Sequence, residues 1–126
     1  MKQTFRKSER LHSKKLIEEL FESGKSIRQS PYVLRYLWHP FEKGEVVQIA
    51  ISIPKKNVRR AVDRNRLKRQ LREAYRLNKE RLISRVAQQD KGLALFLIYT
   101  GKEKENYKFL EDKLKVLLQE VEKLVQ

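Results

Sequence analysis

The sequence predicts an α+β fold for its 126 residues. Helical and strand-like apolar patterns both occur along the chain, and no repeat, linker or low-complexity tract divides it. One helix is expected at about 13–22, a second from after Pro54 to about Asn78 and a third from about 103 onward, with strands at 32–38, 46–53 and 93–100. Because a chain of this length can bury one hydrophobic core, we place a single domain over residues 1–126.

The first helix and the first strand are recognised by the period of their apolar residues. Between about Ser13 and Glu22 these residues recur on one helical face, and Gly24 follows where a helix would stop. From Tyr32 to Trp38 every second residue is bulky and apolar. This period of two predicts a strand with one buried face.

The next two strands and the last helix differ in which of their faces are apolar. Residues 46–53 alternate large aliphatic with small or polar side chains, and a turn segment precedes them, so we expect a hairpin with 32–38. Residues 93–100 are apolar on both faces, as in a central strand. The last segment is expected to be an amphipathic helix packed on the sheet. Its apolar stripe consists of Tyr107, Leu110, Leu114, Leu117, Val121 and Leu124.

Charge is the strongest compositional signal. Thirty lysine and arginine residues stand against sixteen acids, which gives a formal net charge of +14. Such an excess opposes compactness and indicates a polyanionic partner, first nucleic acid and second an anionic membrane surface. No cysteine is present, which excludes disulfides and thiolate metal sites and fits a reducing compartment. We find no pattern of a signal peptide or membrane span and expect a cytoplasmic protein.

The positive charge is concentrated in residues 55–72, which contain nine basic residues and one acid. In a helix with about 100° per residue, Leu67, Leu71, Ala74 and Tyr75 would lie on the side opposite the basic residues. Like charges at i,i+4 disfavour an isolated helix by about 0.2–0.5 kcal/mol per pair. A solvated charged face is the plainer interpretation, but a phosphate-binding surface explains the spacing better. The basic side carries Arg64, Lys68, Arg72 and Arg76, with Asn65 and Arg69 in the same arc and Arg66 just beyond it.

The residue types of this basic side suit RNA or DNA. Arginine meets phosphate oxygens with two parallel hydrogen bonds, and lysine adds a compact charge. Asn65 fits either a contact to a base edge or ribose hydroxyl, or a structural cap or network residue. Charge alone separates neither RNA from DNA nor shape readout from sequence readout.

The sequence offers no active site of its own. Metal-dependent hydrolysis of a phosphodiester needs converging carboxylates, and the apolar strands at 46–53 and 93–100 contain no acid. His12 and His39 are isolated, with no partner at a spacing that indicates acid–base work. We therefore expect no catalytic residue and no metal ligand in this chain.

Residues 53–73 resemble the RNR signature of the bacterial ribonuclease P protein subunit. The resemblance rests on Ile53-Pro54-Lys55-Lys56, then Arg64-Asn65-Arg66, Leu67-Lys68-Arg69 and Arg72-Glu73. Near the start, Phe5, Lys7, Arg10 and Leu11 are similar to the family pattern F-x-K-x-x-R-L. The resemblance covers about residues 5–118.

The resemblance implies a fold and a function. The fold is a two-layer α/β sandwich like the second domain of ribosomal protein S5, with a mostly antiparallel sheet and a left-handed β-α-β crossover, an exception to the usual right-handed rule. The function is assistance to a catalytic RNA with bound Mg²⁺ that removes the 5′ leader from precursor tRNA, with the protein lowering the magnesium requirement. The implied partners are the ribonuclease P RNA and precursor tRNA, with no membrane and no protein partner.

The resemblance also assigns residues to three contacts. The RNA-binding surface takes Lys55, Lys56, Arg60, Arg64, Asn65, Arg66, Lys68, Arg69 and Arg72. The leader cleft, between the first helix and the outer face of the sheet, takes Ile17, Phe21, Val33 and Arg35. The N-terminal RNA contact takes Phe5, Lys7 and Arg10.

Two residues of the leader cleft are open to more than one interpretation. Some relatives carry aromatic residues at the positions of Ile17 and Arg35, so leader contacts here are expected to depend more on Arg35. An arginine among apolar strand residues is expected to face either solvent or an anion. Phe21 has the spacing of a core residue as well as a place in the cleft.

Other classes of protein fit the charge less completely. A DNA-binding basic helix with the C-terminal stripe as a dimer zipper would need the two to be continuous, but a buried strand separates them. A general basic RNA-binding or ribosomal protein gives no reason for the RNR spacing. A membrane-surface role is weaker still, because the apolar stripe of the basic helix is directed to the core.

Overall fold

The computed structural model describes residues 7–41, 45–89, 91–102 and 105–125. The three predicted helices are present, and a further helix follows the basic one after Lys79. In chain order the elements are η1 (Lys7–Glu9), α1 (Lys14–Ser23), β1 (Lys25–Gln29), β2 (Tyr32–His39), β3 (Val47–Ser52), α2 (Ala61–Asn78), α3 (Glu80–Ala87), β4 (Gly92–Tyr99) and α4 (Tyr107–Leu124).

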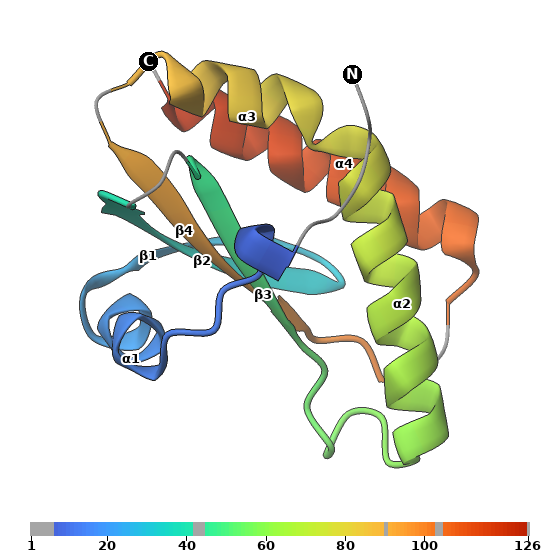
Figure 1. Ribbon diagram of the computed structural model, residues 1–126. Coiled ribbons are helices and arrows are strands. Elements are labelled where there is room, and N and C mark those ends of the chain that lie inside the picture. The colour runs from blue at the N-terminus through green and yellow to red at the C-terminus, as the bar shows by residue number, and fades with distance from the viewer. Residues whose placement is uncertain (1–6, 42–44, 90, 103–104, 126) are drawn as a thin grey trace.

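The four strands form one open sheet in the order β1-β2-β4-β3 (Figure 1). β1 and β2 are an antiparallel hairpin joined through Ser30 and Pro31, whose peptide bond is cis. β2 pairs antiparallel with β4, whereas β3 pairs parallel with β4. The chain between β3 and β4 carries α2 and α3, so the expected α+β architecture with a mostly antiparallel sheet and a β-α-β crossover is confirmed.

The predicted hairpin between 32–38 and 46–53 is wrong. These strands lie on either side of β4, so the prediction that 93–100 is central is confirmed. Alternation within a strand shows which face is buried but not which strand is its neighbour. The sequence also did not predict β1, because its residues KSIRQ include only one large apolar side chain. A strand at the sheet edge tolerates such polar residues.

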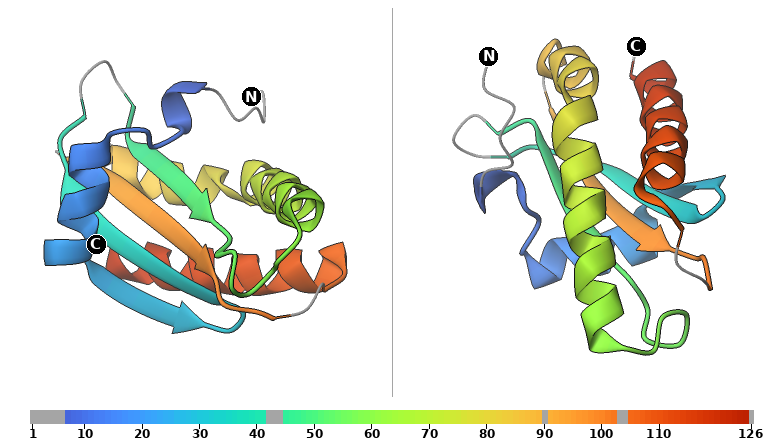
Figure 2. Two further views of the ribbon diagram at one scale, coloured as in Figure 1. Left: turned by 90° about the horizontal axis from the view of Figure 1, so that it is seen from below. Right: turned by 90° about the vertical axis from the view of Figure 1, so that its right-hand side faces the viewer.

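α2, α3 and α4 cover one face of the sheet and enclose the main core (Figure 2). The predicted stripe of α2 is confirmed, because Leu67, Leu71, Ala74 and Tyr75 are all buried. The strand faces that alternation predicted as buried also pack in this core. They consist of Tyr32, Leu34, Tyr36 and Trp38 on β2, and Val47, Ile49 and Ile51 on β3 with Ile53 beyond it.

α4 has the predicted position against the sheet but differs at its ends. Asn106 caps it, because its side-chain oxygen accepts a hydrogen bond from the Phe109 N–H at 2.8 Å. The helix therefore begins at Tyr107 rather than near 103. The predicted stripe is wrong at Leu124, whose exposed fraction is 48%. The backbone leaves helical geometry at the next residue, so Val125 is buried instead.

α1 packs on the opposite face of the sheet from α4 (Figure 2). Its predicted start is confirmed, because Ser13 Oγ accepts a hydrogen bond from the Leu16 N–H at 3.2 Å. Leu16 and Leu20 are buried in a second, smaller core on this face. At the other end, a Cβ on Gly24 would lie 2.4 Å from the Leu20 carbonyl oxygen. Only glycine therefore allows the close turn into β1.

Candidate nucleic-acid interface

α2 turns its basic residues away from the main core. Because its apolar stripe is buried, the remaining sides of the helix reach solvent. An open hollow on this side is lined by Val62, Asn65, Arg66, Lys68, Arg69 and Arg72. The structure thus brings together five residues of the predicted RNA-binding set, and we call Asn65, Arg66, Lys68, Arg69 and Arg72 the α2 basic surface. Asn65 is exposed inside the helix, whose N-cap is Arg60, so the cap interpretation of Asn65 is excluded.

A second basic hollow lies before the start of α2. The helix begins only at Ala61, so the predicted RNA-binding residues Lys55, Lys56 and Arg60 lie in the preceding segment and not on the helix. This hollow is lined by Lys56, Asn57, Val58, Arg59, Arg60, Asp63 and Lys102. The sequence reasoning missed Lys102 here, because nothing local to it shows that the chain after β4 returns to this place.

Arg64 points back to the segment before α2. Its Nη1 donates hydrogen bonds to the carbonyl oxygens of Val58, at 3.0 Å, and Arg59, at 2.7 Å. Val58 is itself buried, so these bonds hold the segment against the helix. Arg64 therefore positions the second basic hollow in addition to contributing charge.

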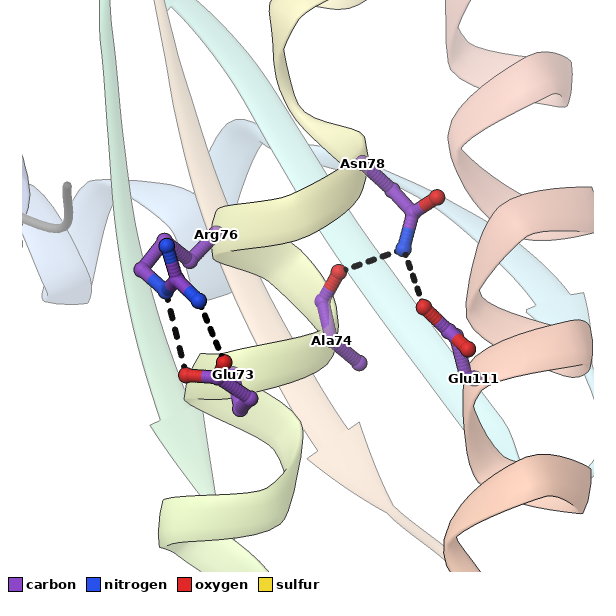
Figure 3. A network of polar contacts seen from close by, with 5 residues as sticks. All are labelled: Glu73, Ala74, Arg76, Asn78 and Glu111. Atoms are coloured by element: carbon purple, nitrogen blue, oxygen red, sulfur yellow. Dashed lines mark hydrogen bonds and ion pairs between the residues drawn. The ribbon is translucent and has the colours of Figure 1, made fainter. Parts of the chain in front are cut away.

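Polar contacts at the end of α2 neutralise the charge of one arginine that was expected on the basic side (Figure 3). Arg76 Nε donates to Glu73 Oε2 at 3.0 Å, and Arg76 Nη2 donates to Glu73 Oε1. These bonds lower the pKa of Glu73 and raise the pKa of Arg76 relative to their ordinary values. Asn78 Nδ2 donates to the Ala74 carbonyl oxygen at 2.7 Å and to Glu111 Oε2 at 3.0 Å, which joins α2 to α4.

The residues predicted for the N-terminal RNA contact separate in the structure. Phe5 lies outside the described residues, and Lys7 is exposed in η1. Arg10 lines a hollow beside β3 together with Lys68 and Arg72. Arg10 therefore adjoins the α2 basic surface.

The predicted leader-cleft residues lie on α1 and on the sheet face that α1 partly covers. Phe21 has an exposed fraction of 49%, so its core interpretation is wrong. Its ring packs edge-on against Phe96, with 5.1 Å between ring centroids. Ile17 and Val33 are half-buried.

Arg35 was expected to face solvent or an anion, but its side chain donates hydrogen bonds to backbone carbonyl oxygens of this chain. Its Nε donates to the Leu20 carbonyl oxygen at 2.9 Å, and its Nη2 donates to those of Phe21, at 3.1 Å, and Gly24, at 3.0 Å. Carbonyls at the end of a helix lack partners within the helix and carry partial negative charge. Arg35 therefore anchors the end of α1 to β2.

Phe96 and Ile98 share this sheet face but were absent from the predicted site. The strand register places Phe96 beside Arg35 and Ile98 beside Val33. Both side chains are half-buried. Because 93–100 is apolar on both faces, its sequence does not show which residues face α1, and only the register does.

Groups that could catalyse hydrolysis or bind a metal are dispersed. No set of three or more histidine, aspartate or glutamate side chains within the described ranges could hold a metal ion. His12 lines the hollow that contains Arg10, and the ring of His39 packs against that of Phe41 with 5.0 Å between centroids. In the described part of the chain, no helix combines the length and apolar character needed to cross a membrane.

Comparison with known proteins decides between the remaining classes. A family model described as Ribonuclease P matches residues 5–122. The chain belongs to the ribonuclease P protein family. The resemblance carried by α2 and the N-terminal pattern is thereby confirmed.

Individual family members are similar in sequence and fold. Ribonuclease P protein components of Chlorobium phaeobacteroides and Porphyromonas gingivalis are each 42% identical to this chain, over 64% and 60% of its length. These alignments span 58% and 56% of the length of the two relatives. The RNase P protein of Thermotoga maritima superposes with a TM-score of 0.69 at 26% identity, covering 89% of this chain and 96% of that one. That of Staphylococcus aureus, at 18% identity, has the same fold with a TM-score of 0.72 and coverage of 91% and 96%.

Proposed function

We propose that this chain is the protein subunit of ribonuclease P and assists its catalytic RNA in removing the 5′ leader from precursor tRNA. Family membership supports the proposal, and the α2 basic surface is the observation that carries it, because four cations and an amide surround one open hollow. Arginine and lysine in such an arrangement suit the phosphates of an RNA backbone. We assign the ribonuclease P RNA to this surface.

We assign the 5′ leader of precursor tRNA to the sheet face beside α1. Single-stranded RNA is bound by stacking of its bases on aromatic side chains and arginine planes. Phe21 offers a half-exposed ring for this purpose, and the guanidinium of Arg35 lies against the same ring. Val33 and Ile98 extend the face with apolar surface.

Catalysis belongs to the RNA in this proposal. The described residues hold no carboxylate cluster that fits Mg²⁺, so we place the magnesium ions on the RNA subunit and the substrate. The protein neutralises phosphates and holds the leader, which reduces the magnesium concentration that the complex needs. We place this complex in the cytoplasm.

Single-turnover cleavage of a leader-bearing precursor tRNA tests the proposal. A bacterial ribonuclease P RNA is assayed at low magnesium with the protein and without it, and the protein is assayed alone. We expect cleavage only in the combined reaction, with a 5′-phosphate on the mature tRNA. Cleavage by the protein alone would contradict catalysis by the RNA. No gain from the protein, at a salt concentration where it still binds RNA, would reduce it to a general RNA-binding protein.

A matched pair of variants assigns the effect to α2. Arg69→Ala removes an exposed cation of the α2 basic surface, and Lys115→Ala removes an exposed cation from α4. Only Arg69→Ala should raise the protein concentration needed for cleavage.

The affinity of the unmodified protein for RNA should depend strongly on salt. With about six to ten phosphate contacts, this affinity should fall by about 10³–10⁵ between 50 and 200 mM salt.

A further inference from the structure

A pocket lies between α2 and the start of α4, on a different side of α2 from the α2 basic surface (Figure 1). Its volume is about 270 Å³. Ligand pockets of proteins are commonly larger, so this volume suits one small heterocycle and not an extended ligand. The lining consists of Asp63, Arg66, Leu67, Gln70, Glu105, Asn106 and Tyr107.

Side chains of α2 form one wall of this pocket. Asp63, Arg66 and Gln70 follow one another at spacings of three and four residues, which places them on one stripe of the helix. Leu67 adds a buried apolar surface. Asp63 and Gln70 are half-buried, whereas Arg66 is exposed and also lines the hollow of the α2 basic surface. This wall therefore presents a carboxylate, an amide and a guanidinium around an apolar centre.

Tyr107, the first residue of α4, supplies an aromatic wall. Its hydroxyl is buried. Burial raises the pKa of this hydroxyl above the ordinary value, and the charges of Glu111 on α4 and Glu73 on α2 raise it further. The ring is therefore held between the two helices. A ring that is already fixed loses little conformational entropy when a flat group stacks on it.

The charge of the lining distinguishes this pocket from a phosphate site. Two of the lining residues, Asp63 and Glu105, are carboxylates, and one, Arg66, is a cation. None of the residues that line the hollow of the α2 basic surface is a carboxylate. Because like charges repel, a phosphate is favoured in that hollow and disfavoured in the pocket. A neutral, planar group with both hydrogen-bond donors and acceptors fits the pocket better.

Guanine is the nucleobase whose edges match these side chains. Arginine donates two parallel hydrogen bonds to its O6 and N7. The N1–H and the amino group on its other edge are both donors, and a carboxylate offers two acceptors for them. Adenine has an amino group in place of O6, which Arg66 cannot satisfy. Its N1 is an acceptor, which a carboxylate would repel.

We propose that the pocket between α2 and α4 binds a guanine base. Arg66 donates to its O6 and N7, Asp63 accepts from its N1–H and amino group, and the ring of Tyr107 stacks on its face. An unpaired guanine of an RNA and a free guanine nucleotide present the same groups to this pocket. The proposal concerns recognition of a base, so it goes beyond the phosphate and leader contacts of the proposed function and does not rest on them.

Titration of the intact protein with nucleoside monophosphates tests the pocket. The guanosine, inosine, adenosine and cytidine compounds carry the same phosphate, so differences in their affinities report the base. We expect the guanosine compound to bind about tenfold more tightly than those of adenosine and cytidine. The inosine compound lacks the amino group and should bind more weakly than that of guanosine. Equal affinity for all four compounds would overturn the proposal.

NMR locates the binding in the same titration. The signals of the Gln70 side-chain amide and of the Tyr107 ring should shift with guanosine monophosphate. The side-chain amide of Gln119, exposed on α4, should not shift. Shifts that spare both Gln70 and Tyr107 would place the nucleotide elsewhere and contradict the proposal.

Two conservative substitutions assign the contacts to the base. Asp63→Asn leaves one acceptor in place of two and should reduce the preference for the guanosine over the inosine compound, whereas Asp112→Asn, exposed on α4, should not. Arg66→Lys keeps the charge but removes the planar pair of donors. It should therefore abolish the preference for guanine over adenine and leave affinity for inorganic phosphate unchanged. Full preference in both Asp63→Asn and Arg66→Lys would overturn the assignment.

Short single-stranded RNAs distinguish the two sources of the base. Oligouridylates with one central guanosine or one central adenosine have equal numbers of phosphates, so their phosphate contacts are matched. Tighter binding of the guanosine oligomer that is lost in Asp63→Asn would identify an unpaired guanine of RNA as the ligand. A preference found only among the mononucleotides would identify a free guanine nucleotide. Neither measurement uses cleavage, so the pocket and the proposed function can fail separately.

Discussion

The guanidinium carbon of Arg35 lies 5.3 Å from the centre of the Phe21 ring, while its nitrogens donate to three carbonyl oxygens at the end of α1. One side chain thus fixes a helix to the sheet and borders the ring that we assign to the leader. Experiments on this face must separate the stability that Arg35 provides from its contact with RNA.

Replacement of Arg35 by alanine is expected to lower both stability and leader discrimination. Loss of hydrogen bonds from a charged donor should reduce the free energy of unfolding by about 2 kcal/mol, measured by chemical denaturation. Affinity for leader-bearing precursor tRNA should fall more than affinity for mature tRNA. Lys115→Ala, which removes an exposed charge from α4 on the other side of the sheet, is the control. Equal losses for the two RNAs would remove Arg35 from the leader contact.

Replacement of Phe21 by alanine is expected to affect binding more than folding. Its ring is half-exposed, whereas stacking of one base on an aromatic ring is worth about 1–3 kcal/mol. Affinity for the leader should therefore fall by about fivefold or more, as measured with precursors of increasing leader length. Leu124→Ala, at an equally exposed apolar position of α4, should change neither affinity nor the length dependence. A leader affinity unchanged by Phe21→Ala would contradict stacking at this ring.

The two arginines of α2 should differ when each is replaced by alanine. Arg69 is exposed, so Arg69→Ala should weaken RNA binding and leave the thermal midpoint of unfolding unchanged. Arg64→Ala removes two hydrogen bonds to the segment before α2 and should lower that midpoint as well as affinity. Identical midpoints for the two would show that the bonds of Arg64 are dispensable.

Replacement of Glu73 by glutamine should strengthen RNA binding. The substitution removes the ion pair that neutralises Arg76, so the salt slope of RNA affinity should become steeper by about one. Glu120→Gln, which breaks the pair with Lys123 at the same i,i+3 spacing on α4, should leave the slope unchanged. An unchanged slope in Glu73→Gln would place Arg76 outside the RNA contact.

The same pair predicts a small dependence of stability on pH. The pKa of Glu73 is lowered in the folded protein, mainly by its hydrogen bond with Arg76. The stability that the pair contributes is therefore present above the ordinary pKa of glutamate and is lost as the pH falls through the lowered value. Because both groups are partly exposed, the loss should be small and should disappear in Glu73→Gln.

Two asparagines of α2 should have opposite roles. Asn78→Ala removes the link from α2 to Glu111 of α4 and should reduce the free energy of unfolding by about 1–2 kcal/mol, with RNA affinity little changed. Asn65→Ala should reduce RNA affinity at unchanged stability, since its side chain is exposed in the hollow of the α2 basic surface. Chemical denaturation and RNA titration of both variants measure these opposite effects on stability and on RNA affinity. A destabilised Asn65→Ala would favour the network interpretation of that residue.

Local pattern was sufficient for α2 and its surface. A helix repeats its geometry every few residues, so the spacing of Leu67, Leu71 and Tyr75 determines which side is buried. The exposed cations follow from the same periodicity. The buried stripe of α2, its end near Asn78 and the composition of the α2 basic surface could therefore be predicted from the sequence, whereas its start at Ala61 could not.

Pairing of strands could not be predicted in the same way. The alternation in β2 and β3 specified the buried face of each, but both are neighbours of β4 and not of each other. Neighbours in a sheet are set by contacts between residues far apart in the chain, and a local period carries no information about them. β1 shows the same limit, because an edge strand needs no apolar pattern of its own.

By itself the sequence determined the α+β class, the central strand, the basic helix and the family to which the chain belongs. Each of these depends only on local periodicity or on a contiguous motif. Only the tertiary structure decided that Arg35 anchors α1, that Arg64 holds the segment before α2, and that Glu9 pairs with Lys79. A long, flexible and charged side chain pairs with whichever suitable group lies near it in the folded protein. The roles of such side chains therefore depend on which distant segments the folded core brings within reach.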